Sequence, residues 1–453
     1  MLPLMSHICI TAHGAVANTD QPQTAAIQAA IDTVATAGGG TVRIPPGIWL
    51  TGTLRLCHRL TLDLAPGAVL RGSTDIADYP PVAVDDNPQH NKDLQPHHLL
   101  LADGCEDLLI TGGGTIDGNG PAFWDPPSNC EFYTSNGPRP SPMLEFAQCR
   151  NLRLQQVRII NSPGWTVHIH GCHQVRIQGI EIVNDLFGPN TDGIDITDSC
   201  DCHVSDCRVV AGDDAIVLKS LGGVNERIVV TNCILQTRCS ALKLGANESI
   251  GTIRQVAFSN CVIHDSSRGL HLACMAGGTF EDISISNIIC DTHNDLALVN
   301  PIHIDCSWWP KSSYPFKPGI IRRVRISGVT VRSDARIMVT AGPQCRVEDV
   351  ILSDIHLHYP TVENEFDWAR TAVALQFSPQ TPEARGAQAA ICAENIDRLQ
   401  LRNISINWPA DCPVPMRAVW GRHLRGGIID CPLAQAAQAD LPALDLEECS
   451  IRV

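Results

Sequence analysis

A short pattern that recurs along the chain constrains the fold more than any other feature of the sequence. It reads apolar, any, apolar, any, any, apolar or Cys, any, apolar. Six consecutive copies, separated by 23, 27, 26, 28 and 27 residues, begin at Leu152, Val175, Cys202, Ile228, Val256 and Ile283. Further copies, with longer insertions between them, begin at Val324, Val350 and Leu399. The chain therefore repeats one structural unit of about 27 residues.

Each copy alternates apolar and other residues, breaks at a turn and continues as a second short strand. Repetition of such a unit every 20–30 residues is typical of a parallel β-helix. A single coil cannot bury its own apolar face, so successive coils must stack. Leucine-rich repeats are the competing solenoid, but the Leu and Asn spacing that they need is missing. We predict an all-β fold, a parallel β-helix that forms one domain over residues 1–453.

The two ends of the chain depart from the repeat. The stretch "TAAIQAAIDTVATAGGG" (24–40) has the Ala and Ile spacing of one amphipathic helix and ends in a glycine run. A solenoid exposes core and strand edges at its ends, so we predict that a helix at about residues 20–40 caps the N-terminal end. At the other end, about residues 425–453 read as a tail made of a weak coil and a terminal arm.

Three of the 20 cysteines occupy one position of the repeat. Cys207, Cys233 and Cys261 stand where other copies carry Val157 or Ile180. A cysteine that exchanges with Val and Ile is expected to be a small core residue, in preference to a disulfide or a metal ligand. No CxxC pairs have the spacing of a zinc site, so we predict no metal and no cofactor.

Charge and hydropathy exclude several partners. The net charge of −15 and pI of about 5.5 give no support to nucleic-acid binding. No apolar run reaches 18 residues, so we expect no membrane span. The start of the chain lacks a basic segment and a clean apolar core, which predicts no signal peptide. The lack of a predicted signal peptide and the expected inward-facing thiols together favour a cytoplasmic location. If a leader was removed, the location would be secreted or periplasmic. The oligomeric state stays open.

The second strands of four successive coils align by their apolar residues. They read "DGIDIT" from Asp192, "DAIVLK" from Asp214, "SALKLG" from Ser240 and "RGLHLA" from Arg268. The alignment places a row of side chains on the outer face, namely Asp195, Val217, Lys243 and His271. A row of very small residues precedes it, Gly193, Ala215, Ala241 and Gly269. We expect these small residues to form a shallow floor for a ligand.

Three carboxylates gather at the start of two of these strands. Asp192 and Asp214 should stack one coil apart, with Asp213 on the same rim. A Gly-Asp-Asp turn is the simpler explanation of the doublet alone. Crowded, partly buried carboxylates can also divide into an acid and a base, because like charges and burial raise one pKa. An acid and a base about 6.5–9.5 Å apart leave room for a water and invert the anomeric carbon of a sugar.

At this point the chain resembles glycoside hydrolase family 28, the polygalacturonase family of right-handed β-helix enzymes. The resemblance rests on the N-terminal stretch from residue 24, "RIINSPGWTVHIHGC", "NTDGIDI" (190–196) and "GDDAIVLKS" (212–220). It implies that Asp213 is the general acid and that Asp192 and Asp214 position and deprotonate the water. It also implies roles in substrate binding for Asn190 and Lys219. The chain is most similar to the divergent, mostly bacterial branch of the family.

Two family motifs are altered. Ser240 stands where the family's Gly-His-Gly has its histidine, and His271, Leu272 and Ala273 replace the Arg-Ile-Lys that grips a carboxylate. Lys243, Arg268 and His271 could rebuild a cationic subsite, and an ordinary solvated face is the alternative.

Aromatic residues gather in one insertion, "CSWWPKSSYPF" (306–316). Trp308 and Trp309 are candidates for stacking on a sugar ring. A loop that packs on its own aromatic residues is the alternative.

The expected function is that of a glycosidase that cleaves pectin-derived or related plant oligosaccharides with inversion, in an exo mode. Its partner would be an oligosaccharide or polysaccharide. A polysaccharide lyase or an epimerase on the same scaffold, or a non-catalytic carbohydrate-binding solenoid, are the alternatives.

Overall fold

The computed structural model describes residues 6–82, 94–125, 133–246, 249–293, 300–308, 315–362 and 381–453. The chain divides into two compact units. The N-terminal unit comprises Met1–Ile216 and Ile228–Cys233, and the C-terminal unit comprises Val217–Arg227 and Ile234–Val453. Two of the three points of division lie within strands β21 (Ile216–Lys219) and β22 (Val224–Thr231).

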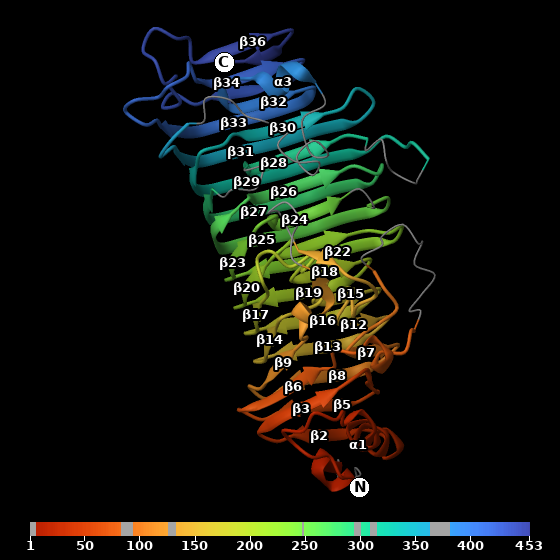
Figure 1. The fold of residues 1–453 in the computed structure, drawn as a ribbon. Helices are drawn as coiled ribbons and strands as arrows, with labels where there is room; N and C mark the ends of the chain where they lie inside the picture. The colour runs from red at the N-terminus through yellow and green to blue at the C-terminus, as the bar shows by residue number, and fades with distance from the viewer. Residues whose placement is uncertain are drawn as a thin grey trace. The chain divides into compact units, whose positions relative to one another are not determined.

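The strands of the N-terminal unit form three parallel ladders (Figure 1). The first ladder contains β4 (Leu54–Arg55), β7 (Leu100–Asp103), β12 (Leu144–Ala147), β15 (Val167–His170) and β18 (Ile194–Thr197). The second contains β1 (Ser6–Cys9), β2 (Gly40–Ile44), β5 (Leu60–Leu64), β8 (Glu106–Thr111), β13 (Arg150–Gln155), β16 (His173–Gln178) and β19 (Cys200–Ser205). The third contains β3 (Gly47–Thr51), β6 (Ala68–Gly72), β9 (Thr115–Asp117), β14 (Arg158–Ile160), β17 (Glu181–Val183) and β20 (Arg208–Ala211). This arrangement is the coil of a parallel β-helix.

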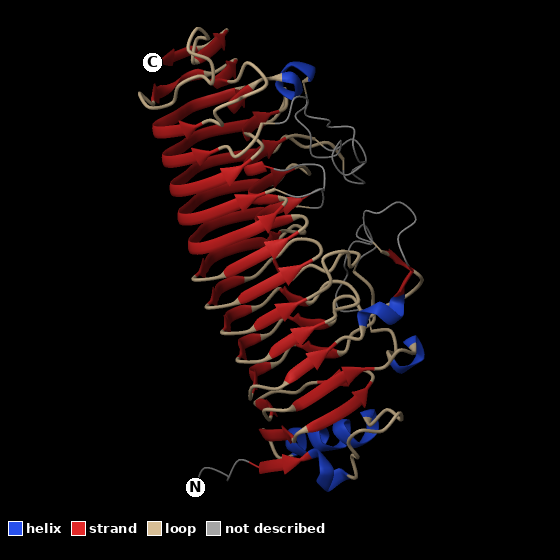
Figure 2. Cartoon of the chain, turned by 60° about the vertical axis from the view of Figure 1, so that its left-hand side comes forward, coloured by secondary structure: helices blue, strands red, loops and turns tan. Residues whose placement is uncertain are grey.

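Short elements leave the ladders of the N-terminal unit at the loops. They are η1 (Ile10–His13), η2 (Ile76–Asp78), η3 (Gly120–Phe123), and the antiparallel pair β10 (Trp124–Asp125) and β11 (Thr134–Ser135). The helices among them are blue in Figure 2.

The C-terminal unit repeats the same organisation with longer strands. One parallel ladder contains β24 (Ser240–Ala246), β26 (Arg268–Cys274), β28 (Asn300–Cys306), β30 (Ile337–Ala341), β32 (Ala389–Glu394), β34 (Arg417–Arg422) and β36 (Leu444–Glu447). The other contains β25 (Thr252–Ser266), β27 (Thr279–Thr292), β29 (Ile320–Ser333), β31 (Arg346–His358), β33 (Ile396–Asn407), β35 (Arg425–Asp430) and β37 (Ser450–Arg452), with β23 (Ile234–Thr237) paired to β25. A short helix, α3 (Pro382–Gly386), precedes β32.

The repeat position that carries cysteine is inside the coil, as predicted. In the C-terminal unit the strand register aligns Cys261 with Ile288, Val329 and Ile355, and all four are at most 1% exposed. Cys207 and Cys233 are equally buried in the N-terminal unit. None of the cysteines in the described ranges forms a disulfide. The three thiols at this repeat position therefore act as core residues, and Cys261 stacks on Ile288 of the next coil.

The predicted N-terminal cap is present. Helix α1 (Thr24–Thr36) buries Ile27, Ala30, Ile31 and Val34, which are spaced to share one helix face. This face packs on the first strands of the N-terminal unit, and α1 lies beside β2 at the end of the ladders (Figure 1). The all-β fold with a capping helix is thereby confirmed.

The C-terminal segment from residue 425 continues the coil. Residues 425–453 contain β35, β36 and β37, which pair with preceding strands of both ladders. Backbone pairing extends the coil here although few apolar residues mark it. Within the described ranges, no helix is both long enough and apolar enough to cross a lipid bilayer.

Candidate active site

Backbone pairing places Asp192 and Asp214 on neighbouring coils of the N-terminal unit. The N–H of Gly193 donates to the carbonyl oxygen of Asp214 (2.8 Å), and the N–H of Ile194 donates to that of Ala215 (3.0 Å). Each aspartate directly precedes the residue that enters the ladder. Both carboxylates are only 2% exposed. The predicted stacking of the two aspartates is therefore present within this unit.

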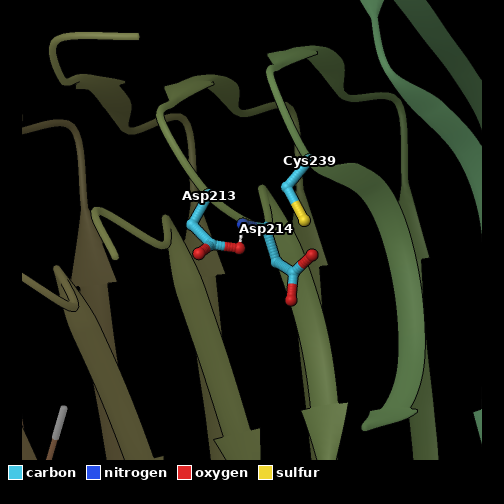
Figure 3. Close-up of side chains that lie close together, drawn as sticks. All are labelled: Asp213, Asp214 and Cys239. Atoms are coloured by element: carbon cyan, nitrogen blue, oxygen red, sulfur yellow. Dashed lines mark hydrogen bonds between the residues drawn. The ribbon is translucent and has the colours of Figure 1, made fainter. Parts of the chain in front are cut away.

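Asp213 is more exposed than its two neighbours and is held by two donors. Its Oδ1 accepts the backbone N–H of Asp214 (2.9 Å; Figure 3), and its Oδ2 accepts a long hydrogen bond from Asn190 Nδ2 (3.5 Å). Residues 212 and 213 lie in a bend of the backbone, which the Gly-Asp-Asp sequence favours. The doublet thus forms a turn and also presents one carboxylate toward solvent beside two buried ones.

The acidic pair also bears on the prediction of no metal. A carboxylate oxygen of Asp213 lies within 4.8 Å of one of Asp214, close enough for the two to share a cation. Acidic neighbours alone do not define a metal site, and we assign none here.

Asn190 links Asp213 to a buried arginine. Its Oδ1 accepts from Arg139 Nη2 (3.4 Å), and its backbone has a positive φ of 51°, which asparagine tolerates better than most residues. Arg139 is 2% exposed and comes from the loop between β11 and β12. This arginine was not predicted from the sequence, because its loop lies outside the repeat.

The row of small residues does not form the expected floor for a ligand. A Cβ at Gly193 would meet the Ala215 carbonyl oxygen at 2.4 Å and Val209 Cγ1 at 2.5 Å. A Cβ at Gly269 would meet Cys290 Sγ at 2.3 Å. Val209 and Cys290 are core residues. The prediction is wrong because both glycines face the interior, Gly193 from the bend before β18 and Gly269 from the second position of β26.

The outer face of the first ladder carries a buried polar row. Glu145, His168 and Asp195 are aligned across β12, β15 and β18, and each is at most 3% exposed. His168 Nδ1 lies 2.8 Å from Glu145 Oε2, and His168 Nε2 lies 3.0 Å from Thr197 Oγ1. Burial raises the pKa of Glu145 to about 7, although the nearby His98 and His170 act in the opposite direction. Of the residues predicted for the outer row, Asp195 belongs to this buried polar row.

The C-terminal unit brings four of the predicted substrate-binding residues together. Ser240 Oγ lies 3.1 Å from His271 Nδ1, and Lys243 is aligned with His271 across β24 and β26. Arg268 Nη2 lies 3.1 Å from Cys239 Sγ. The four residues Ser240, Lys243, Arg268 and His271 are at most 4% exposed. The alternative of an ordinary solvated face is therefore wrong.

His271 does not supply a positive charge to this cluster. It stacks on His303 of β28, with ring centroids 5.0 Å apart. Burial lowers the pKa of His271 well below its ordinary value, and Arg268, His303 and Lys243 lower it further. Burial and Arg268 lower the pKa of His303 to about 3. Both rings are neutral near pH 7, so Lys243 and Arg268 carry the cationic character of the cluster.

Lys219 and the two tryptophans complete the set of predicted substrate-binding residues. Lys219 ends β21 with 4% exposure, and its carbonyl oxygen accepts from Asn225 Nδ2 (2.5 Å). Trp308 packs edge-on against Phe316, with ring centroids 5.2 Å apart, which favours the loop-packing alternative. Trp309 lies outside the described residues.

Comparison with known proteins assigns the chain to a family. The model of glycosyl hydrolases family 28 matches residues 81–373. The chain belongs to this family. A probable polygalacturonase of Vitis vinifera is 27% identical over 364 residues, which are 76% of this chain and 72% of the relative. Probable polygalacturonase At3g15720 of Arabidopsis thaliana is 31% identical over 213 residues, which are 46% of this chain and 42% of the relative.

Solved structures agree on the fold. An exopolygalacturonase of Thermotoga maritima superposes with a TM-score of 0.69 at 21% identity, covering 89% of this chain and 93% of that one. A family 28 exopolygalacturonase of Yersinia enterocolitica also reaches 0.69, at 17% identity, covering 92% and 78%. The fold is the right-handed parallel β-helix that was predicted.

Membership of family 28 makes this protein a glycosidase. In this glycosidase the N-terminal unit contains Asn190, Asp192, Asp213 and Asp214, and the C-terminal unit contains the cluster around Lys243. Of the residues missed from sequence, His303 had a signal, because "NPIHID" continues the aligned strands by one coil. The sequence signal for Glu145 and His168 was weaker, because it consists only of polar residues within otherwise apolar strands.

Proposed function

We propose that this family 28 glycosidase hydrolyses pectin-derived or related plant oligosaccharides with inversion at the anomeric carbon. The observation that carries the proposal is the backbone pairing that sets Asp192 beside Asp214, with Asp213 held on the same rim by Asn190. The substrate class is supported by the names of the relatives, which are polygalacturonases.

Asp213 is the general acid in this mechanism. Its greater exposure lets a substrate oxygen reach it, and it transfers a proton to the glycosidic oxygen as the bond to the anomeric carbon breaks. Asp192 and Asp214 hold a water on the opposite side of the sugar, and one of them accepts its proton while the hydroxyl adds to the anomeric carbon. One water is consumed, and the new hydroxyl has the inverted configuration.

The substrate-binding assignments are part of the same proposal. Lys243 and Arg268 are suited to a sugar carboxylate, since both are cationic. Ser240, His271 and Lys219 add hydroxyl, imidazole and ammonium groups that can bind sugar oxygens. Trp308 and Trp309 are proposed to contact a sugar ring, although the packing of Trp308 on Phe316 does not favour this for Trp308.

Exo-action is proposed from the loops of the N-terminal unit. Tyr133 stacks on Trp124, with centroids 5.8 Å apart, and meets Phe187 edge-on at 6.5 Å. Phe187 belongs to the segment that leads to Asn190. A loop braced in this way could wall off the substrate beyond the terminal sugar, which would restrict cleavage to chain ends. The cytoplasmic location remains a prediction, and there imported oligosaccharides would be the substrates.

A substrate panel tests the proposal. Purified protein is incubated with oligogalacturonates, rhamnogalacturonan fragments and neutral pectic oligosaccharides, and released reducing ends and product sizes are measured. The parent is expected to release monomers from an acidic oligosaccharide, and Asp213→Asn to lose this activity. Unsaturated products would indicate a lyase and contradict the mechanism. Activity that survives in Asp213→Asn would contradict the assignment of the acid.

A further inference from the structure

A buried arginine lies beside the candidate general acid without being part of the repeat. Arg139 is 2% exposed, and its Nη2 donates to Asn190 Oδ1 (3.4 Å). A charged side chain is costly to bury unless its surroundings compensate the charge. The presence of a guanidinium at this place therefore needs a reason beyond packing.

The surrounding loops hold Arg139 in place. Its backbone N–H donates to Gln95 Oε1 (2.8 Å), and two residues later the N–H of Ser141 donates to the His97 carbonyl oxygen (3.0 Å). Gly164 leaves the space that the side chain occupies, since a Cβ there would lie 3.2 Å from Arg139 Nε and 2.3 Å from Ser141 Oγ. The backbone around Arg139 is thus fixed by two hydrogen bonds, and Gly164 leaves room for the side chain that extends to Asn190.

The contact determines which way the Asn190 amide faces. An arginine only donates hydrogen bonds, so the atom of Asn190 that meets Arg139 must be the acceptor Oδ1. The donor Nδ2 is then directed at Asp213 Oδ2, at 3.5 Å. With the amide reversed, Oδ1 would face the carboxylate and repel it. Two successive contacts therefore connect the buried cation to the exposed carboxylate.

We propose that Arg139 is a positioning residue, which fixes the amide of Asn190 so that Asp213 is held in the orientation needed for proton transfer to the leaving group. The inference rests on the proposed role of Asp213 as general acid. Arg139 acts through Asn190, because its Nη2 donates to the amide oxygen of that side chain. Its loss should impair the step in which the leaving oxygen is protonated and leave substrate binding nearly unchanged.

A comparison of two leaving groups tests this role. The variants Arg139→Met and Arg139→Lys are assayed on an oligogalacturonate, whose leaving sugar needs a proton, and on a 4-nitrophenyl galacturonide, whose phenolate leaves with little protonation. We expect Arg139→Met to lower kcat about 10-fold or more on the oligosaccharide, with much less effect on the aryl substrate and little change in KM. Arg139→Lys should recover part of the loss, because an ammonium still donates to Oδ1.

Controls separate the possible failures. Arg153→Met, at an exposed position of β13, should behave as the parent, and the thermal midpoint of each variant reports folding. Equal losses on both substrates in Arg139→Met, in a folded protein, would overturn the positioning role. Asp213→Asn must show the same leaving-group dependence. If it does not, Asp213 is not the acid and the proposed mechanism falls together with this inference, whatever the arginine variants do.

Discussion

The N–H of Gly193 donates to the carbonyl oxygen of Asp214 across 2.8 Å, and this bond sets the spacing of the two carboxylates that precede neighbouring strands. Because the bond is between backbone atoms, the side chains of Asp192 and Asp214 can be neutralised without removing it. The carboxylates can therefore be tested separately from the coil that carries them.

Replacement of each carboxylate by its amide should abolish turnover and preserve the fold. We expect Asp192→Asn, Asp213→Asn and Asp214→Asn each to lower kcat about 100-fold or more, because an amide neither gives nor takes the proton. Initial rates on the best oligosaccharide of the panel provide the measurement. Asp206→Asn, at an exposed turn after β19, is the matched control and should retain activity. Full activity in any of the three variants would remove that residue from the mechanism.

Gly193→Ala should destabilise the protein and lower its kcat. The new Cβ would lie 2.4 Å from the Ala215 carbonyl oxygen and 2.5 Å from Val209 Cγ1, so the ladder bond next to Asp192 must shift. Overpacking of this kind costs about 1–3 kcal/mol. The thermal midpoint and kcat should both fall. Gly386→Ala is the control, because nothing lies within 4 Å of its Cβ, and an unchanged midpoint in both variants would contradict the packing.

Glu145 should make the stability of the protein depend on pH. Burial raises its pKa from 4.5 to about 7, so the folded state favours the protonated carboxyl. The stability that this provides is present below about pH 4.5 and is lost as the pH rises through 7, by about 3 kcal/mol at most. Glu145→Gln lacks this titration. We expect the thermal midpoint of the parent to fall relative to that of Glu145→Gln between pH 4.5 and 7.5, and a constant difference would contradict the burial of an ionisable group there.

Lys243 should distinguish acidic from neutral substrates. Loss of a charge-assisted hydrogen bond costs about 1.5–3 kcal/mol, so Lys243→Met should raise KM for an acidic oligosaccharide roughly 10-fold or more. KM for a neutral oligosaccharide should stay near that of the parent. Lys317→Met, at an exposed position, is the control. An equal effect on both substrate types would mean that Lys243 supports the fold and does not recognise the negative charge of the substrate.

The fold could be predicted because the repeat records which side chains face inward. Cys261 aligns with Ile288 and Val329 in the structure as it did in the sequence, since each inward position stacks on its equivalent one coil away. Helix α1 was predictable for a similar reason, because Ile27, Ile31 and Val34 mark one buried face. The period of the sequence shows which residues face inward within one coil. Stacking repeats that arrangement from coil to coil.

The surroundings of the site were less predictable. Lys243 and His271 were placed on the outer face, but their burial, at most 4% exposed, was not predicted. Arg139 reaches Asn190 from 51 residues earlier, through a loop that no pattern describes. Gly193 was assigned to a floor because alternation was extended one residue into a turn. In each case the decisive contact is one that the repeat pattern does not report.

The configuration of the first product tests the central claim most directly. Proton NMR is recorded during the first minutes of hydrolysis of the best oligosaccharide, before the released sugar mutarotates. In the proposed mechanism Asp213 is the acid, and Asp192 and Asp214 activate the water. This mechanism predicts that the first anomer to appear has the configuration opposite to that of the cleaved bond. A first product that retains the configuration, or one that carries a double bond, would contradict it.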